Sequence, residues 1–345
     1  MQGLPLLSMQ RVIVPDEIDS RSPPLASLVR DYVGESMGTT WSVRVVDSRQ
    51  AEPPNWQAGI QHQLDQVVAE MSHWRADSEL GRFNRAEAGS WHVMSPAFAE
   101  VMAYALEVAA HSRGAYDPSA GALVNLWGFG PTGNSVTYNS PHFRFPDAAQ
   151  IAAARAQCGW QKLRFEPESR RLFQPGSIQL DLSAVAKGFA VDHVARYLEG
   201  EGLHHYLLEV GGELRGAGMK RDGQPWWVGL EVPEASSLPV TLAALHGLSI
   251  ASSGDYRRYF EYEGQLYAHT VDPRSGYPLN NQVAAVTVLH RQCMAADALS
   301  TALMVMGPEV GLQWADAHGI AARFLLRAGD TYSELLTRRM SEMLQ

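Results

Sequence analysis

The sequence predicts an α+β fold, and two features of its 345 residues lead to this prediction. Segments with the two-residue alternation of strands are concentrated between residues 206 and 289, whereas most helix-like segments lie before or after them. Partial segregation of this kind favours α+β over a doubly wound parallel sheet. Hydrophobic residues make up 46% of the chain, enough for a large core, and the length allows one large domain or two of ordinary size.

The elements of the first half are predicted from the spacing of apolar residues and from proline and glycine, which mark where elements begin and end. Apolar residues recur at helical spacing after Pro53-Pro54, and Ser95-Pro96 is a favourable N-cap and first-turn pair for a second helix. In order, we expect a loose arm over residues 1–30, a strand over 34–46, a helix over 56–73, a polar loop over 74–84, a helix over 96–111 and an ordered loop over 114–133.

The second half is strand-rich and ends in a pair of helices. Ser183 opens a helical pattern, Glu263-Gly264 is a natural hairpin turn, and Gly307-Pro308 separates two helices. The expected order is a short helix from 148, strands near 162–165 and 171–180, a helix over 183–199, strands over 206–210, 226–232, 240–244, 257–262, 265–271 and 283–289, helices over 295–306 and 308–318, and a strand over 321–326.

Charge and composition argue against several classes of function. The formal net charge of −9 disfavours nucleic acid or an anionic membrane as the main partner. The 2 cysteines have neither a Cys-x-x-Cys partner nor nearby His ligands, so zinc or thioredoxin-like chemistry is not expected, and a disulfide between them is left open. The chain as written shows no secretory segment, no cysteine for lipid attachment and no membrane-spanning apolar run, so we expect a cytoplasmic location.

The most informative stretch runs from His269 to Thr301. Its first motif, His-Thr-Val-Asp-Pro-Arg-Ser-Gly, ends an alternating apolar run in a tight turn at Gly276. Its second motif, Met-Ala-Ala-Asp-Ala-Leu-Ser-Thr, opens a helix at Met294. Asp297 and Thr301 are four residues apart on that helix, so their oxygens lie on one face. A carboxylate and a hydroxyl so placed suit Mg²⁺ working with substrate phosphates.

Each of these residues also has a purely structural explanation. An Asp in a first helical turn more often interacts with the helix dipole than with a metal. A Thr in an Ala-rich helix usually packs its methyl group and bonds a carbonyl one turn back. A third pattern is set aside altogether: Gly128 to Gly133 matches G-x-G-x-x-G, but turn-rich residues and not a helix follow it. The metal interpretation therefore depends on the other motifs of the chain.

Further runs accompany these two motifs in a fixed order. They are Met37-Gly-Thr, Ser78-Glu-Leu-Gly-Arg-Phe-Asn, Gly114-Ala-Tyr-Asp-Pro-Ser continuing to Leu126-Trp-Gly-Phe-Gly, Leu180-Asp-Leu-Ser-Ala-Val-Ala-Lys-Gly-Phe-Ala-Val-Asp, Val210-Gly-Gly-Glu and Ser252-Ser-Gly-Asp-Tyr. Together these blocks resemble, in order, the signature of the FAD:protein FMN transferases, the ApbE family, over roughly residues 34–330. No single block is specific, but their order is hard to produce by chance.

The resemblance implies an ApbE-type, T-fold-like single large domain of mixed, mainly antiparallel sheets with packed helices, over residues 31–345. It places FAD and Mg²⁺ in a cleft between two lobes. It also implies an activity, in which the FAD pyrophosphate is split with Mg²⁺, FMN is attached to a threonine of an acceptor flavoprotein, and AMP is released. The acceptor loop is expected to read Asp-Gly-x-Thr-x-Ala-Thr or close to it. Such phosphoryl transfer needs positioning and charge neutralisation more than covalent help.

Matching the blocks residue by residue gives an expected site. The metal ligands implied are Asp297, Thr301 and the backbone carbonyl of Ala184. His269, implied as catalytic together with Asp297, is expected to bind the pyrophosphate or to deprotonate the acceptor hydroxyl. The positions expected to contact FAD are Met37, Trp74, Asn84, Ala115, Tyr116, Asp117, Asp181, Lys187 and Val271. Without the resemblance, the two aromatics among them would be ordinary core residues and the lysine a solvated one.

Two other functions stay open on the sequence. The same site suits a Mg²⁺-dependent FAD pyrophosphatase giving FMN and AMP, in which case Asn84 and its loop would decide how open the site is to water. A non-catalytic FAD-binding protein is the third possibility, against which the presence of both Asp297 and Thr301 argues. Family members are commonly exported, often as lipoproteins, so the resemblance implies a periplasmic or membrane-associated protein although this chain shows neither signal.

Overall fold

An antiparallel sheet of eight strands forms the centre of the computed structural model, which describes residues 10–18, 23, 26–49, 55–131, 143–233, 236, 238–255, 259–262, 265–329 and 331–345. The strand order is β16-β15-β14-β11-β8-β7-β3-β2, and every neighbouring pair is antiparallel. The strands are β2 (Leu28–Ser36), β3 (Thr39–Asp47), β7 (Tyr206–Val210), β8 (Glu213–Ala217), β11 (Leu248–Gly254), β14 (Val283–His290), β15 (Ala321–Ala328) and β16 (Thr331–Leu336). The expected α+β class with mainly antiparallel sheets is confirmed.

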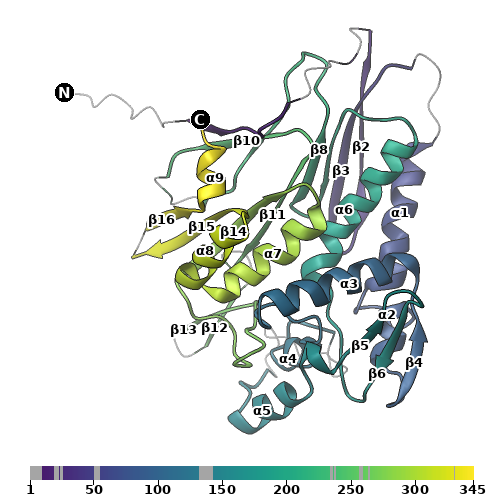
Figure 1. Cartoon of the computed structure of the whole chain (residues 1–345), viewed down its shortest axis with the longest axis vertical. Helices are drawn as coiled ribbons and strands as arrows, with labels where there is room; N and C mark the ends of the chain where they lie inside the picture. Colours follow the sequence, from purple (N-terminus) through teal and green to yellow (C-terminus); the bar gives the residue numbers. More distant parts are fainter. Residues whose placement is uncertain are drawn as a thin grey trace.

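Three helices lie along one face of this sheet: α1 (Trp56–Met71), α6 (Ser183–Gly200) and α7 (Cys293–Met306) (Figure 1). A fourth, α3 (Pro96–His111), packs against all three, and α8 (Pro308–Ala317) packs against α7. Helix α7 is apolar and buried over almost its whole surface, as expected for a helix held between a sheet and other helices. The main core fills the space between helices and sheet, with Trp41, Phe98 and Phe189 among its largest members.

The other face of the sheet is covered in part by a smaller sheet, β1-β10-β9, and by the short helix α9 (Arg338–Glu342). Strands β9 (Trp226–Gly229) and β10 (Thr241–Leu245) are antiparallel, and β1 (Arg11–Ile13) runs parallel to β10. The expected loose arm over residues 1–30 therefore contains a paired strand. The reason is that Ile13 is buried in this second core and Arg11 forms an ion pair with Glu334.

A third group of elements lies beyond α3, at the end of the molecule away from β10 (Figure 1). It contains the sheet β4-β6-β5 and the helices α2, α4 and α5. The bounds are β4 (Ser90–Val93), β5 (Arg164–Glu166), β6 (Arg171–Gln174), α2 (Glu79–Asn84), α4 (Gly121–Leu126), α5 (Ala148–Ala156) and the 3₁₀ turn Trp160–Lys162. Strands β12 (Tyr259–Tyr262) and β13 (Gln265–Ala268) pair as the expected hairpin, whose turn residues lie outside the described part of the chain.

Several expectations need correction. The strand expected over 34–46 is a hairpin, because Met37 and Gly38 take φ of 54° and 73° and turn the chain between β2 and β3. The loops expected over 74–84 and 114–133 contain helices α2 and α4, and residues 132–133 of the second lie outside the described ranges, as does the turn-rich stretch after the rejected glycine motif. The disulfide left open is absent: Cys158 and Cys293 are both buried free thiols.

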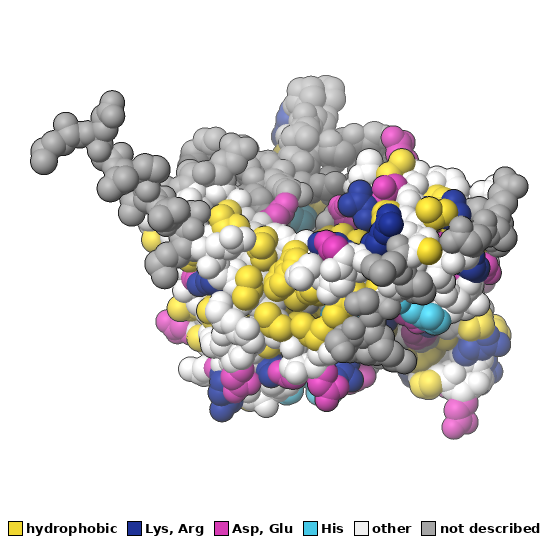
Figure 2. Space-filling model, turned by 90° about the horizontal axis from the view of Figure 1, so that it is seen from above, with side chains coloured by type: hydrophobic (Ala, Val, Ile, Leu, Met, Phe, Trp, Pro, Cys, Tyr) yellow, Lys and Arg dark blue, Asp and Glu magenta, His cyan; other side chains and the backbone are white. Residues whose placement is uncertain are grey.

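The described surface carries both signs of charge. On the face seen in Figure 2, apolar side chains gather in a central area, and basic and acidic side chains are interspersed around it. Within the described ranges, no helix is long and apolar enough to cross a membrane.

Candidate active site

The candidate site lies where α6 begins beside α7. Asp181 precedes the helix, and its Oδ1 accepts the Ser183 N–H at 2.8 Å, one of the donors that a helix start leaves without a partner. Ala184 has φ −94° and ψ 21°, so the backbone departs from helical geometry in the first turn. The Gly188 N–H, which a regular helix directs at the carbonyl of residue 184, donates to Asp297 Oδ2 at 2.9 Å. The turn from Ala184 to Gly188 is therefore held next to the Asp297 carboxylate.

Asp297 is a buried carboxylate with a hydroxyl cluster on the same helix. Its side chain is only 4% exposed, and burial raises its pKa, although Lys187 and the Gly188 N–H act in the opposite direction. One turn later, Thr301 Oγ1 lies 2.8 Å from the hydroxyl of Ser253 on β11. The Ser253 hydroxyl also lies 2.8 Å from that of Ser300. The expected carboxylate and hydroxyl thus share one face of α7 and meet the sheet there.

Lys187 and Glu213 form an ion pair between α6 and the first residue of β8. Glu213 is buried, and within the described ranges its Oε2 has no hydrogen-bond partner. Burial raises the pKa of Glu213 to about 7; repulsion from Asp297 adds to this effect and attraction to Lys187 opposes it. Burial would lower the pKa of Lys187, but attraction to Glu213 and Asp297 outweighs it and the pKa is raised. Two buried carboxylates therefore interact with one ammonium group, whose side chain is 36% exposed.

The loop after α3 brings a second group of acidic and aromatic residues to the same place. The Asp181 N–H donates to the Pro118 carbonyl at 2.8 Å, which joins this loop to the start of α6. Asp117 accepts hydrogen bonds from the N–H groups of Ser119 and Trp160, at 2.8 and 3.1 Å. Tyr116 is buried, and its hydroxyl has no hydrogen-bond partner among the described residues.

Electrostatics link Tyr116 to the cluster on α7. Burial raises the pKa of Tyr116 well above its ordinary value, and the negative charges of Asp297, Asp181 and Asp117 raise it further. Ala115, which precedes it, is also buried. The structure therefore brings together the expected residues of this loop, the α6 start and α7.

His73 is a site neighbour that sequence reasoning missed. Its Nδ1 lies 3.4 Å from Asp181 Oδ1, and both side chains are nearly buried. Burial would lower the pKa of His73, but the charge and hydrogen bond of Asp181 outweigh it and the pKa is raised. Burial alone would raise the pKa of Asp181, but His73 and Ser183 hold it below its usual value. A histidine at the end of a helix gives no signal of this partner in the sequence.

The remaining expected FAD contacts border this cluster in different ways. Met37 occupies the β2–β3 turn, which lies beside the β7–β8 turn because the Gly211 N–H donates to the Thr40 carbonyl at 3.1 Å. Trp74 is 62% exposed and therefore not the core aromatic that composition alone would allow. Val271 is buried and forms an isolated bridge with Pro278.

Asn84 and His269 each make contacts within the protein, in addition to the FAD and phosphate contacts expected of them. The Asn84 side chain exchanges two hydrogen bonds with the backbone of Leu180, at 2.9 and 2.7 Å, so it fixes the residue before Asp181. His269 follows β13 and lies edge-on to Phe129, with ring centroids 6.3 Å apart. Direct contact of either residue with FAD stays a prediction.

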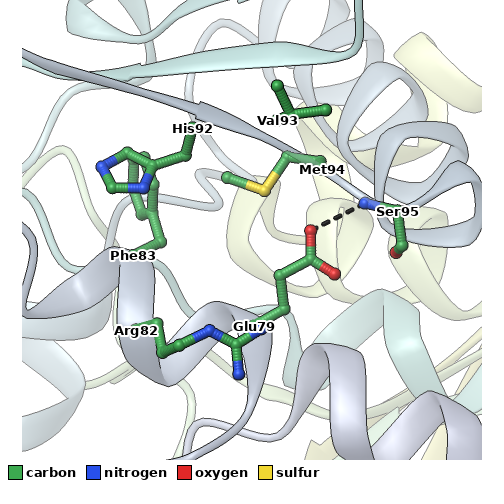
Figure 3. Close-up of a pocket in the computed structure, with 7 residues that line it drawn as sticks. All are labelled: Glu79, Arg82, Phe83, His92, Val93, Met94 and Ser95. Atoms are coloured by element: carbon green, nitrogen blue, oxygen red, sulfur yellow. Dashed lines mark hydrogen bonds between the residues drawn. The ribbon is translucent and has the colours of Figure 1, made fainter.

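Two surface pockets of the described residues are lined by other side chains than those of the cluster. The pocket in Figure 3, about 390 Å³, is lined by Glu79, Arg82, Phe83, His92, Val93, Met94 and Ser95. Its carboxylate is already engaged, because Glu79 accepts the Ser95 N–H at 2.7 Å. The other, about 440 Å³, lies between residues 272–281 and the end of α7. The Glu79 carboxylate of the first pocket thus has a structural role at the start of α3. The second pocket includes residues of the loop that follows His269.

The donor set has the chemistry of a magnesium site. Among the described residues, no three side chains of His, Cys, Asp or Glu gather to hold a metal ion. Mg²⁺ instead commonly takes one or two carboxylates, with water and substrate phosphate completing the shell. Asp297, the Thr301 hydroxyl and the Ala184 carbonyl, at a kink held against Asp297, would fit such a shell.

Comparisons with known proteins agree with the sequence motifs. The ApbE family model matches residues 37–324. The FAD:protein FMN transferase of Klebsiella pneumoniae (strain 342) is 36% identical over 328 residues, which cover 94% of this chain and 91% of that protein. The protein of the same name from Vibrio cholerae serotype O1 is 38% identical over 303 residues, with 87% and 88% covered.

Solved structures give the same result for the fold. The apo form of the Pseudomonas stutzeri flavinyl transferase ApbE matches with a TM-score of 0.83 and 38% identity, over 92% of this chain and 97% of that one. The flavin transferase ApbE from Vibrio cholerae matches with a TM-score of 0.80 and 33% identity, over 92% and 99%. The fold is thus that of one ApbE-type domain. Sequence and structure together show that this chain belongs to the ApbE family.

Proposed function

We propose that this protein is an FAD:protein FMN transferase: it moves FMN from FAD to a threonine hydroxyl of an acceptor flavoprotein in a Mg²⁺-dependent reaction that releases AMP. The observation that carries the proposal is the junction of α6 and α7. There the Asp297 carboxylate is bonded to Gly188, next to a kinked helix start and one turn from the Thr301 hydroxyl. Relatives named for this activity cover most of the chain, which supports the same assignment.

The residues of the site would have three roles: metal binding, phosphate binding and proton transfer. Asp297, Thr301 and the Ala184 carbonyl would hold Mg²⁺, which when bound neutralises charge on the transferring phosphoryl group. The Lys187 ammonium, near the start of α6, would face the FAD phosphates and neutralise part of their charge. His269 would accept the proton of the acceptor hydroxyl, help that is typically worth about 10²–10⁴-fold in rate.

Binding of FAD would draw on the remaining expected positions. Met37 at its turn and exposed Trp74 offer apolar and aromatic surface around the acidic cluster, and the loop from Ala115 to Asp117, in which Ala115 and Tyr116 are buried, would support it from within. Asp181 is held by His73 and Ser183, and Val271 lies beyond β13. Asn84 would act through Leu180, which it fixes immediately before Asp181.

One incubation separates this proposal from its alternatives. The protein is mixed with FAD, Mg²⁺ and a peptide containing Asp-Gly-x-Thr-x-Ala-Thr, and the products are identified by mass spectrometry. We expect a peptide carrying one FMN-phosphoryl unit, with AMP in equal amount. Free FMN and AMP without a modified peptide would indicate an FAD pyrophosphatase. Unchanged FAD in the presence of both Mg²⁺ and several such peptides would contradict an enzymatic role.

A prediction for His269 belongs to the same proposal. Replacement of His269 by Ala should lower the rate of transfer by about 10²–10⁴-fold if the imidazole takes the proton. A general base acts on the reaction and not on FAD binding, so FAD affinity should change little. Initial rates and FAD titrations measure the two separately. If both stay at wild-type values, His269 is structural.

A further inference from the structure

The Lys187 ammonium is held by Glu213 and not by Asp297. Within the described part of the chain, Lys187 pairs with the Glu213 carboxylate, which β8 presents at its first residue. Asp297 is close enough to affect both Lys187 and Glu213 electrostatically. Its Oδ2, however, accepts a hydrogen bond from the Gly188 N–H. Lys187 is thus bonded to Glu213, and Asp297 affects it through charge.

The carboxylate that Lys187 binds matters, because a lysine ammonium and a metal cation compete for the same carboxylate oxygens. An ammonium group bonded to Asp297 would neutralise the charge that Mg²⁺ needs and would occupy its oxygens. Lysine side chains are long and flexible and can exchange partners readily. The Lys187 side chain is 36% exposed, so water offsets part of its charge, whereas Asp297 is buried and its negative charge is poorly screened. Without Glu213, Lys187 would therefore be drawn to Asp297.

The backbone around Glu213 holds its carboxylate in place. Gly211 and Gly212 have φ of 62° and 104°, and a Cβ on Gly211 would come 2.7 Å from the Thr39 side chain. The β7–β8 turn therefore has a tight path that fixes where β8 starts. Glu213 is 3% exposed, and among the described residues its second oxygen has no hydrogen-bond partner, so its ionised form depends mainly on Lys187.

We propose that Glu213 is a positioning residue that holds the Lys187 ammonium away from Asp297, so that the Asp297 carboxylate stays available to Mg²⁺ and the ammonium to the FAD phosphates. This rests on the proposed function, because it assumes a metal at Asp297. Glu213 touches neither metal nor substrate in this arrangement. It acts through Lys187 alone, and that makes the proposal testable by a double-mutant cycle.

The experiment measures Mg²⁺ binding by calorimetry, with and without FAD, at about pH 8, where Glu213 is ionised because burial raises its pKa only to about 7. The variants are Glu213→Gln, Lys187→Met and the double variant. Changes in groups that support a metal ligand typically cost about 10–100-fold in metal affinity, and we expect a loss of this size for Glu213→Gln. In the Lys187→Met background the same change should alter affinity less than about twofold, because no ammonium is left to move.

Two controls exclude a general effect on folding. Arg215→Met removes two other ion pairs between the same elements, Arg215 to Asp192 at 2.9 Å and to Glu199 at 3.7 Å, and should leave Mg²⁺ affinity unchanged. Glu213→Asp keeps the charge on a shorter side chain and should recover part of the affinity lost in Glu213→Gln. Unfolding temperatures are recorded for all variants, so that a loss of fold is not mistaken for a loss of metal.

The outcomes separate this inference from the proposed function. An equal loss of affinity from Glu213→Gln in both backgrounds would mean that Glu213 acts on the metal directly, and the inference would be wrong. Wild-type affinity in Glu213→Gln would also overturn it. A wild-type protein that transfers FMN but binds no Mg²⁺ would remove the metal requirement and this inference with it. A wild-type protein that binds Mg²⁺ as expected but does not transfer FMN would contradict the proposed function only.

Discussion

At the residue scale, the site depends on polar groups held in a buried setting. Asp297 and Glu213 are both buried carboxylates, and each keeps its position through a specific partner, Gly188 for the first and Lys187 for the second. A charge without a partner in such a setting is costly, so these groups are expected to be sensitive to small changes. Spacing on one helix was sufficient to predict that Asp297 and Thr301 share a face. The contact between Glu213 and Lys187 was not predictable, because it joins α6 and β8 and no local sequence pattern shows that these two elements pack together.

The first residue-scale prediction concerns Asp297→Asn. The amide keeps the volume and an oxygen that can accept the Gly188 N–H, and it removes a buried charge, so stability should stay near the wild-type value. Transfer should fall by about 10³-fold, because metal stabilisation of the phosphoryl group amounts to several kcal/mol. Urea unfolding and initial rates in Mg²⁺ test the two parts. Near-normal transfer by this variant would exclude Asp297 as a ligand.

The second concerns the pH dependence of the pair His73–Asp181. The pKa of Asp181 is lowered in the folded protein, so its contribution to stability is present above its unfolded pKa, about 3.9, and is lost as pH falls. The pKa of His73 is raised, so its contribution is present below its unfolded pKa, about 6.5, and is lost as pH rises through the folded value. The pair should therefore stabilise the protein most between these limits.

Comparison with His73→Gln measures this contribution. The difference in free energy of unfolding should be largest near pH 5–6, on the order of 1 kcal/mol as for a single ion pair, and should shrink as the pH rises through the raised pKa of His73. Chemical unfolding at a series of pH values gives the difference directly. A difference that does not change with pH would mean that packing, and not charge, holds His73.

At the scale of elements, helices were predicted better than strands. The helices beginning at Trp56, Pro96, Ala148, Ser183 and Pro308 were confirmed because caps, prolines and apolar periodicity mark their ends locally. Strands β8 and β11 were not predicted, although both lie in the middle of the sheet. Each is short or rich in small polar residues, as in Glu-Leu-Arg-Gly-Ala, and gains its strand conformation from its neighbours.

A prediction at this scale concerns the contact of α6 with α7 at Gly188. A Cβ at this position would lie 2.3 Å from the Cys293 carbonyl oxygen and 2.8 Å from Asp297 Cβ. The helix backbones must move apart to accept it, which typically costs about 1–3 kcal/mol, and the Gly188–Asp297 bond would be displaced. Gly188→Ala should therefore lose both stability and Mg²⁺ affinity, as measured by unfolding and calorimetry.

Gly200, in the last turn of the same helix, provides the matched control. A Cβ there meets no atom within 4 Å, and Gly200→Ala should change stability by less than about 0.5 kcal/mol. Equal behaviour of the two variants would show that helix propensity and not the α6–α7 contact decides the effect at Gly188.

At the scale of the whole molecule, the fold collects segments that are far apart in sequence. The sheet order places β3, β7, β8 and β11 side by side, which brings the turns at Met37 and Gly211 together and sets Glu213 beneath α6. Helix α7 then carries Asp297 to the same point from the end of the chain. The order of motifs predicted the family, but only the sheet topology explains why these motifs meet.

The burial of this cluster makes a last prediction about the acceptor. Asp297, Glu213 and Tyr116 are all nearly inaccessible, so an acceptor hydroxyl must be carried inward by a narrow, extended segment. In-line approach of the hydroxyl to the FMN-side phosphorus, opposite the departing AMP, also requires freedom of the backbone around the threonine. A threonine in a helix interior has its backbone bonded and its approach blocked by the adjacent turns.

The same Asp-Gly-x-Thr-x-Ala-Thr sequence should therefore be modified in an unstructured peptide or an exposed loop, and at least about tenfold more slowly when it is built into a stable helix, a difference of about 1.4 kcal/mol in the barrier. Mass spectrometry of both substrates after incubation with enzyme, FAD and Mg²⁺ measures the two rates, and circular dichroism confirms the helix in the second. A scrambled peptide of the same composition controls for non-specific transfer. Equal rates in the loop and the helix would show that the acceptor does not enter as an extended chain and that the reacting phosphate lies at the surface when FAD is bound.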